Sequence, residues 1–119
     1  MNDIKRVILK LSGEALAGTK GYGIDPIVVD EIAKEIKEIK KTNIEVAIVV
    51  GGGNFWRGRS SGQMDRTRAD HMGMLATVIN SLALSSALTV AGLKAKVLTA
   101  IRMEPIGEFY SKWKAIECM

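Results

Sequence analysis

The sequence has 119 residues, of which 47% are hydrophobic and 25% charged, which fits one soluble globular domain and excludes a disordered chain. The formal net charge of +4 favours anionic partners, either nucleotides or nucleic acid. Its one cysteine, Cys118, cannot form an intramolecular disulfide, and the first residues lack the apolar core of an export signal, so we expect a cytoplasmic protein.

Strand and helix patterns alternate along the chain. Residues 7–11 form a short apolar run typical of a first strand, and a glycine-containing loop separates it from a helix with Asp25 as N-cap and a proline at its first position. The next strand, 46–50, is apolar throughout, which is typical of a central parallel strand covered on both faces. We also expect a strand at 96–99 and a last helix starting at Pro105. The residues of that helix expected to face inward are Ile106, Phe109, Trp113 and Ile116.

The uncharged run 72–93 is long enough to span a bilayer. Polar side chains nevertheless recur along the whole run, at Thr77, Asn80, Ser81, Ser85, Ser86 and Thr89. Because a bilayer would desolvate these groups at a cost, we instead predict a helix from Asp65 to Gly92 that is buried from nearly all sides, as a helix between subunits is. The alternation of strands and helices predicts a parallel sheet with right-handed crossovers in a single domain, 1–119.

Three glycines and an asparagine, 51–54, directly follow the second predicted strand. In open α/β sheets, ligands bind beyond the carboxyl ends of the strands. Glycines there allow the backbone to approach a ligand closely, and successive N–H groups can form an anion-binding nest. One glycine would serve a tight structural turn, whereas three in a row, followed by Arg57, favour phosphate binding.

Lys10 precedes a second turn, Ser12-Gly13, at the end of the first predicted strand. We expect its ammonium group at the same sheet edge as residues 51–54, where a cation could neutralise charge on a transferring phosphoryl group. Taken alone, Lys10 is most simply a solvated lysine at a strand end, but two such turns together favour phosphate chemistry. Neither turn matches the P-loop or the G-x-G-x-x-G fingerprint.

Five motifs carry a resemblance to a known family. They are KLSGEAL at 10–16, GYGID at 21–25, GGGNFWRG at 51–58, MDR at 64–66 and ADHMGMLAT at 69–77. In their order and spacing the sequence resembles the amino acid kinase family, and within it the bacterial UMP kinases. The last motif separates these from acetylglutamate and aspartate kinases. The resemblance runs from about residue 5 to the end of the sequence and covers roughly the first half of such a kinase.

The resemblance implies a fold and an activity. The fold would be the three-layer α/β/α arrangement of the amino acid kinases, which is carbamate kinase-like, with a mainly parallel sheet, and residues 1–119 would be its truncated, N-terminal half. The activity would be phosphoryl transfer from ATP to UMP, giving UDP and ADP in pyrimidine nucleotide biosynthesis. Mg²⁺ would be bound through the nucleotide phosphates and not by a protein metal site. Because half of each substrate site would lie elsewhere, we expect this chain alone to be weakly active or inactive.

The resemblance also implies roles for individual residues. Lys10 would stabilise the phosphoryl group in flight, and Arg57 would share in catalysis at the ATP phosphates. UMP would contact Gly52, and Asp70 would accept hydrogen bonds from its ribose. The residues implied to contact ATP are Lys10, Leu11, Ser12, Gly13, Gly53 and Arg57. The loop linked in the family to allosteric activation by GTP comprises Gly18, Thr19, Lys20, Gly21, Tyr22 and Gly23. Family members are typically hexameric, so we expect a homo-oligomer whose subunits meet at the uncharged helix.

Two other functions stay open. A kinase of the same fold could phosphorylate a carboxylate, as acetylglutamate kinase does, although the acid Asp70 suits a ribose hydroxyl better than a carboxylate substrate. A non-catalytic fragment could bind nucleotides or nucleic acid through the arginines of 57–68. Aromatic residues for base stacking are few there, with only Phe55 and Trp56 adjacent, which argues against nucleic acid. The single histidine, His71, has no cysteine or second histidine nearby with which to bind a metal.

Overall fold

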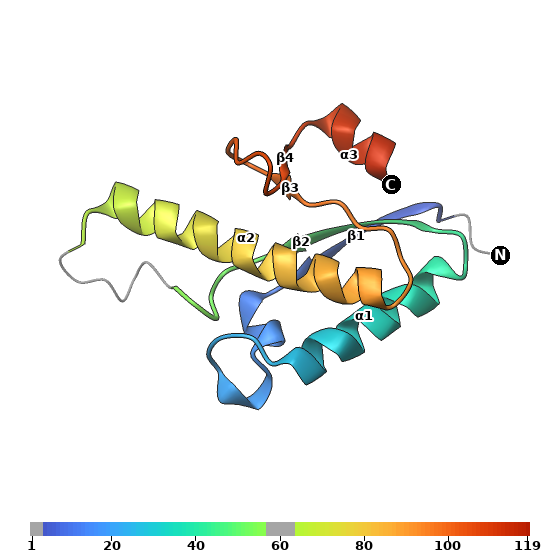
Figure 1. Cartoon of the computed structure of the whole chain (residues 1–119), viewed down its shortest axis with the longest axis horizontal. Helices are drawn as coiled ribbons and strands as arrows, with labels where there is room; N and C mark the ends of the chain where they lie inside the picture. Colours follow the sequence, from blue (N-terminus) through green and yellow to red (C-terminus); the bar gives the residue numbers. More distant parts are fainter. Residues whose placement is uncertain (1–3, 57–63) are drawn as a thin grey trace.

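Two parallel strands of equal length lie side by side in the fold. In the computed structural model, which describes residues 4–56 and 64–119, β1 (Arg6–Leu11) pairs with β2 (Glu45–Val50) in a parallel register (Figure 1). Arg6 lies opposite Glu45 at one end, where the two side chains form an ion pair of 2.9 Å, and Leu11 lies opposite Val50 at the other. The strands therefore end together, and the turns that follow them begin at the same edge.

Helix α1 (Pro26–Lys40) connects the two strands and has the predicted N-terminus. The side chain of Asp25 accepts a hydrogen bond from the Ile27 N–H at 3.1 Å, and the proline occupies the first helical position. Lysines in the last turn complement the helix dipole. Asn43, with a φ of 66°, takes the left-handed conformation just after the helix. The side chains that α1 buries are Val29, Ala33 and Ile36.

Helix α2 (Arg66–Val90) begins as predicted, because the side chain of Asp65 accepts a hydrogen bond from the Arg68 N–H at 3.2 Å. Figure 1 shows α2 lying between α1 and the segment that carries β3, β4 and α3. The expected burial on nearly all sides is wrong, since only 28% of its most apolar stretch is buried. By length and composition α2 could also cross a membrane, but core helices of soluble proteins pass the same test, and α2 packs against α1. Its exposed large apolar residues are Met72, Met74, Leu75, Ile79, Leu82 and Val90.

The core lies between one face of the strand pair and the two long helices. Side chains from both strands, both helices and the turn after β1 form one apolar cluster. Each large apolar side chain buried there contributes about 1.5–3 kcal/mol. The opposite face of the strands is open, because Ile8 and Val49 are 67% and 56% exposed. The prediction that the second strand, β2, is covered on both faces is therefore wrong. The buried members of the cluster are Leu16, Val29, Ala33, Ile36, Val50, Leu84 and Leu88.

The segment after α2 contains a second, smaller strand pair. The strand predicted at 96–99 is present as β3 (Leu98–Thr99), but it pairs in parallel with β4 (Glu108–Phe109) and not with β1 or β2. The third strand of the structure therefore belongs to a separate two-stranded sheet.

The helix predicted from Pro105 is wrong over its first half. Residues 104–106 form a turn before β4, and the helix α3 (Lys112–Cys118) begins later, with Ser111 as its N-cap. The apolar residues after Pro105 do have helical spacing, but residues 108–109 pair with β3 and so form a strand instead. Gly107 lies so close to β3 that a β-carbon there would be 2.9 Å from the Thr99 Cγ2 atom. The side chain of Trp113, expected to face inward, is 73% exposed.

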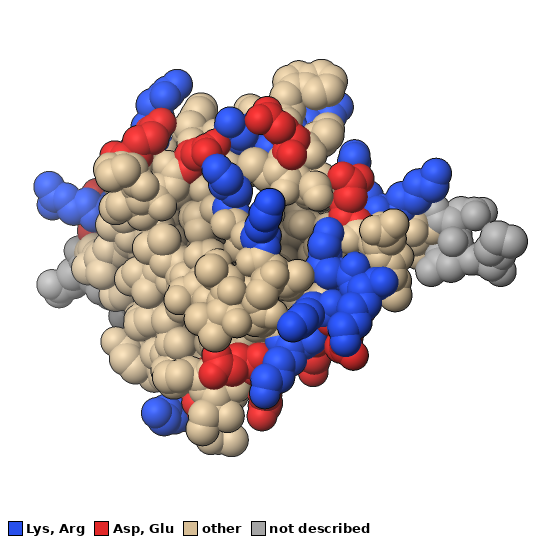
Figure 2. Space-filling view, turned by 45° about the vertical axis from the view of Figure 1, so that its right-hand side comes forward, with Lys and Arg blue, Asp and Glu red and all other residues tan. Residues whose placement is uncertain are grey.

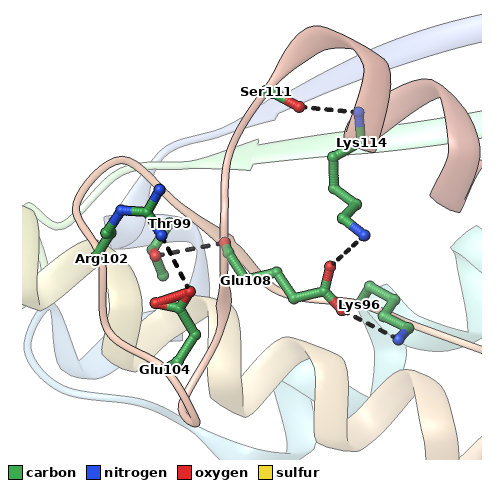
Figure 3. Close-up of polar contacts among 7 residues, drawn as sticks. All are labelled: Lys96, Thr99, Arg102, Glu104, Glu108, Ser111 and Lys114. Carbon is green, nitrogen blue, oxygen red and sulfur yellow. Dashed lines mark hydrogen bonds and ion pairs between the residues drawn. The ribbon is translucent and has the colours of Figure 1, made fainter.

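Glu108 links the parts of this last segment (Figure 3). Its carboxylate forms ion pairs with Lys96 at 3.3 Å and with Lys114 of α3 at 3.0 Å. The hydrogen bond from Lys114, and to a smaller extent that from Lys96, holds the pKa of Glu108 below its usual range. The hydrogen bond with Glu108 in turn raises the pKa of Lys114. Because these groups are solvated, their pairing orients α3 more than it stabilises the fold.

Candidate active site

The two glycine turns predicted to bind phosphate are in direct contact. The Gly51 N–H donates a hydrogen bond to the Leu11 carbonyl at 2.9 Å, which continues the pairing of β1 and β2 into the turns. A β-carbon on Gly13 would lie 2.7 Å from the Gly53 nitrogen and 3.0 Å from the Gly51 oxygen. Only glycine allows this approach of backbone to backbone. The structure thus brings Gly13 together with residues 51–53 at one edge of the strand pair.

Gly52 packs against helix α2. A β-carbon on Gly52 would lie 2.8 Å from the Ala76 Cβ atom and 3.0 Å from the Gly73 carbonyl oxygen. The glycine is therefore required by the packing of the turn on the helix. The sequence pattern predicts only the approach of a ligand at this glycine and does not reveal its packing on the helix.

A buried pair of asparagine side chains lies behind the turn. Asn54 and Asn80 are 1% and 0% exposed, and their amides donate hydrogen bonds to each other at 3.0 Å and 2.7 Å. Asn80 also donates to the Gly51 carbonyl, and Asn54 donates to the Gly23 carbonyl. In the sequence, Asn80 is only one of several polar residues along the uncharged run 72–93. One feature of the sequence could have indicated the pair: an amide near the middle of an uncharged helix is expected to be buried, and a buried amide needs a hydrogen-bond partner.

The loop predicted to be regulatory lies on the glycine turn. It includes the short 3₁₀ helix η2 (Gly18–Lys20), and the Gly23 N–H donates a hydrogen bond to the Asn54 carbonyl at 2.9 Å. The ring of Tyr22 meets the ring of Phe55 edge to face, with centroids 5.9 Å apart. The loop and the turn therefore form one connected surface.

The other residues predicted for the first turn lie on both faces of the strand pair. Lys10 lies opposite Val49 on the open face of the strands and is exposed, and Ser12 is exposed at the start of the turn. The side chain of Leu11 packs on the hydrophobic core, so this residue can reach a ligand only through its backbone. Lys10 and Ser12 thus provide a cation and a hydroxyl at the carboxyl end of β1.

Glu14, which is not among the predicted site residues, adds a negative charge to this edge. It lies in the first turn of the 3₁₀ helix η1 (Gly13–Leu16). A β-carbon on Gly53 would lie 2.6 Å from the Glu14 Oε1 atom, so the carboxylate covers this glycine. A carboxylate here repels phosphate oxygens and attracts cations. The edge therefore combines a lysine, an acid and turn N–H groups.

Two further predicted residues belong to the other side of the turn. Asp70 is exposed on α2, and it shares a helix face with Gly73 and Thr77, against which Gly52 packs. It therefore lies about one helical turn from the Gly52 contact. Arg57 lies outside the described residues. In the described part of the chain, no group of three or more His, Cys, Asp or Glu side chains could hold a metal ion.

A hollow of about 520 Å³ lies elsewhere, between the end of α2 and helix α3. Lys94, Lys96 and Lys114 are among the residues that line it. None of the residues predicted for the site lines this hollow. The glycine turns thus form an open edge, at which the groups available to a ligand are backbone N–H groups and charged side chains.

The sequence model of the amino acid kinase family matches residues 5–113, which is most of the chain. The chain belongs to the amino acid kinase family. Among curated members, the uridylate kinase of Bacteroides thetaiotaomicron is 64% identical over 121 residues, which cover 100% of this chain and 51% of that protein. The uridylate kinase of Parabacteroides distasonis is 60% identical with the same coverage. The chain spans about half the length of the curated relatives it matches.

Solved amino acid kinases share the fold. The crystal structure of UMP kinase from Bacillus anthracis superimposes with a TM-score of 0.89 at 40% identity, over 98% of this chain and 49% of that chain. Carbamate kinase from Giardia lamblia bound to citric acid gives a TM-score of 0.57 at 19% identity, over 98% of this chain and 46% of that chain, a likeness of fold alone. These matches confirm the parallel α/β fold class predicted from the sequence.

Proposed function

We propose that this chain is the part of a UMP kinase that carries its phosphate-binding turns, and that the whole enzyme transfers a phosphoryl group from ATP to UMP. The observation that carries the proposal is the contact between the turn at Gly13 and the turn at 51–53, which places two sets of backbone N–H groups at one sheet edge. The high identity to the uridylate kinases of Bacteroides thetaiotaomicron and Parabacteroides distasonis supports UMP as the acceptor.

The residues of the edge would divide the work of phosphoryl transfer. Lys10 would neutralise charge on the group in flight, and the turn at Ser12 would bind the ATP phosphates beside Gly53. UMP would lie toward α2, against Gly52 and within reach of Asp70. Mg²⁺ fits this edge because the ion prefers oxygen ligands, which the phosphates of a bound nucleotide would supply, and because the carboxylate of Glu14 lies beside Gly53. When bound with ATP, the ion would screen the negative charge of the phosphates.

The partners of the protein are part of the proposal. Exposed apolar side chains follow one another along α2 at spacings of three and four residues, and a second copy of the chain would cover them in a homo-oligomer, a hexamer as in the family. A GTP effector would act through the loop at 18–23, which touches the glycine turn. We propose a soluble, cytoplasmic enzyme. The exposed side chains that define this helix surface are Met72, Leu75, Ile79 and Leu82.

The described part of the structure supports neither alternative function, and residues 57–63 of the arginine segment lie outside it. Figure 2 shows a face on which Lys and Arg side chains form one larger group bordered by Asp and Glu, and not an uninterrupted basic surface for nucleic acid. The likeness to carbamate kinase is one of fold alone, so it gives no reason to prefer a carboxylate-type substrate.

A binding experiment tests the proposed substrate. Isotope-labelled chain would be titrated with UMP, and its backbone N–H resonances followed, with N-acetylglutamate as the matched control. We expect UMP to shift the resonances of Gly52 and Asp70 and the control to leave them in place. Shifts at these residues with N-acetylglutamate alone would refute UMP as the acceptor. A second assay with ATP, Mg²⁺ and UMP should yield little UDP from this chain by itself, because transfer needs both substrates fully positioned.

A further inference from the structure

The amides of Asn54 and Asn80 form a closed hydrogen-bonded unit in the protein interior. Each amide donates one N–H to the oxygen of the other, at 3.0 Å from Asn54 and at 2.7 Å from Asn80. The remaining N–H of Asn80 is donated to the Gly51 carbonyl at 2.7 Å, and that of Asn54 to the Gly23 carbonyl at 2.8 Å. All four N–H groups therefore have acceptors. Such complete pairing is what makes a buried polar group tolerable in the core.

The pair connects three segments that are distant in the sequence. Asn80 belongs to helix α2, Asn54 follows the glycine turn, and Gly23 closes the loop at 18–23. The loop is held twice, because the Gly23 N–H also donates to the Asn54 carbonyl at 2.9 Å. A change in the loop must therefore move Asn54 or break two hydrogen bonds.

The pair also fixes the direction of one donor in the turn, the Gly52 N–H. Glycine adopts many backbone conformations, so residues 51–53 do not select one by themselves. The Gly51 N–H is held by the Leu11 carbonyl, and the Gly51 carbonyl is held by Asn80. Because a trans peptide is planar, its N–H points opposite to its carbonyl, so the Gly52 N–H is directed away from Asn80. A single side chain thus sets the orientation of this donor.

We propose that Asn54 and Asn80 are positioning residues, which hold the Gly52 N–H ready for phosphate and tie that orientation to the loop at Gly23. The proposal rests on the proposed function, in which the turn binds nucleotide phosphates. Donors that are already oriented need no rearrangement when the ligand binds. Loss of the pair should therefore weaken phosphate binding even where the fold persists.

The first test compares Asn80→Ser with Ser81→Ala. The control removes the neighbouring hydrogen bond from the Ser81 hydroxyl to the Thr77 carbonyl, at 2.8 Å, and leaves the turn untouched. Isotope-labelled chains would be titrated with sodium triphosphate. We expect the control to bind like wild type and Asn80→Ser to bind about ten-fold more weakly or worse, as loss of preorganisation predicts. The Gly23 resonance should respond to triphosphate in wild type and not in Asn80→Ser. Wild-type affinity in a folded Asn80→Ser chain overturns the proposal.

A second test uses no variant and so does not depend on how Asn80→Ser folds. Binding at the turn and integrity of the pair must support each other to the same extent. Saturating triphosphate should therefore slow hydrogen exchange of the side-chain amides of Asn54 and Asn80 in wild type by about ten-fold. Unchanged exchange in the bound chain overturns the positioning role alone. A wild-type chain that binds no triphosphate overturns the phosphate site itself, and with it this role.

Discussion

A β-carbon on Gly52 would lie 2.8 Å from the β-carbon of Ala76, closer than two such atoms can approach. The turn at 51–53 and helix α2 therefore fit together only because one of these two residues has no side chain. Substitutions at Gly52 consequently report on packing as well as on ligand binding, and the two effects have to be separated by a compensating change in the helix.

We expect Gly52→Ala to lower the free energy of unfolding by about 1–3 kcal/mol, the usual effect of overpacking. Adding Ala76→Gly should restore part of that loss, because it removes the methyl group that the new β-carbon meets. Ala76→Gly alone should cost about 1 kcal/mol through its helix propensity. Urea unfolding of the four chains gives the comparison. Equal stability of Gly52→Ala and wild type would show that the turn does not pack on α2 in this way.

Lys10→Met should weaken binding of ATP while leaving the free energy of unfolding within about 0.5 kcal/mol of wild type, since Lys10 is exposed on the open face of β1. Isothermal titration with ATP measures the affinity. Lys34→Met on helix α1 is the matched control, because this lysine is also exposed but lies away from the glycine turns. Equal losses in the two variants would mean that only the net charge of the chain matters.

Glu14→Gln should strengthen the binding of triphosphate in the absence of Mg²⁺, because it removes a carboxylate that covers Gly53. With Mg²⁺ present the gain should shrink, since the cation screens the same charge. Glu31→Gln on α1 controls for the change in net charge. Weaker binding of triphosphate by Glu14→Gln, with or without Mg²⁺, would show that the carboxylate supports the turn and does not oppose the ligand.

Ile79→Asp should dissociate an assembly formed through α2, because it places a charge in the exposed apolar surface of that helix. Sedimentation velocity over a range of concentrations measures the change. Ile27→Asp is the control, since Ile27 is 71% exposed on the other long helix, α1. A wild-type chain that stays monomeric at high concentration would contradict assembly through this surface.

The order of the segment after α2 should depend on pH through Glu108. The pKa of this carboxyl is lowered by Lys114 and then Lys96, so its contribution to stability is fully present above the pKa of the unfolded chain. It is lost as the pH falls through the lower pKa of the folded chain. Hydrogen exchange at β3 and β4 should therefore speed up under acid more than exchange of α1. In Glu108→Gln this extra acid sensitivity should be absent, and its persistence would assign the effect to another group.

Local signals were sufficient for some parts of this fold. The N-cap at Asp25 and the one at Asp65 depend on residues within one helical turn, and both were correctly predicted. The meeting of the two glycine turns followed from a general property of parallel strands, whose carboxyl ends share an edge.

The parts that the sequence did not reveal depend on tertiary placement. Asn54 and Asn80 are 26 positions apart, and only the docking of α2 on the turn shows that they meet. The spacing of apolar residues after Pro105 is typical of a helix, but the pairing of β4 with β3 overrode that local preference. The exposure of α2 and of Val49 could not be predicted either, since an apolar pattern does not say which partner covers it.

The apolar cluster of the core has a consequence for the order of events during synthesis. Its buried members end at Leu88, and the partly buried side chains that pack on it end at Ala95. None of them belongs to β3, β4 or α3. The cluster can therefore close as soon as residue 95 has left the ribosome, while residues 96–119 are still inside the exit tunnel. A nascent chain stalled with residues 1–95 outside the exit tunnel should already resist protease, and the remaining segment would then be added to a preformed base.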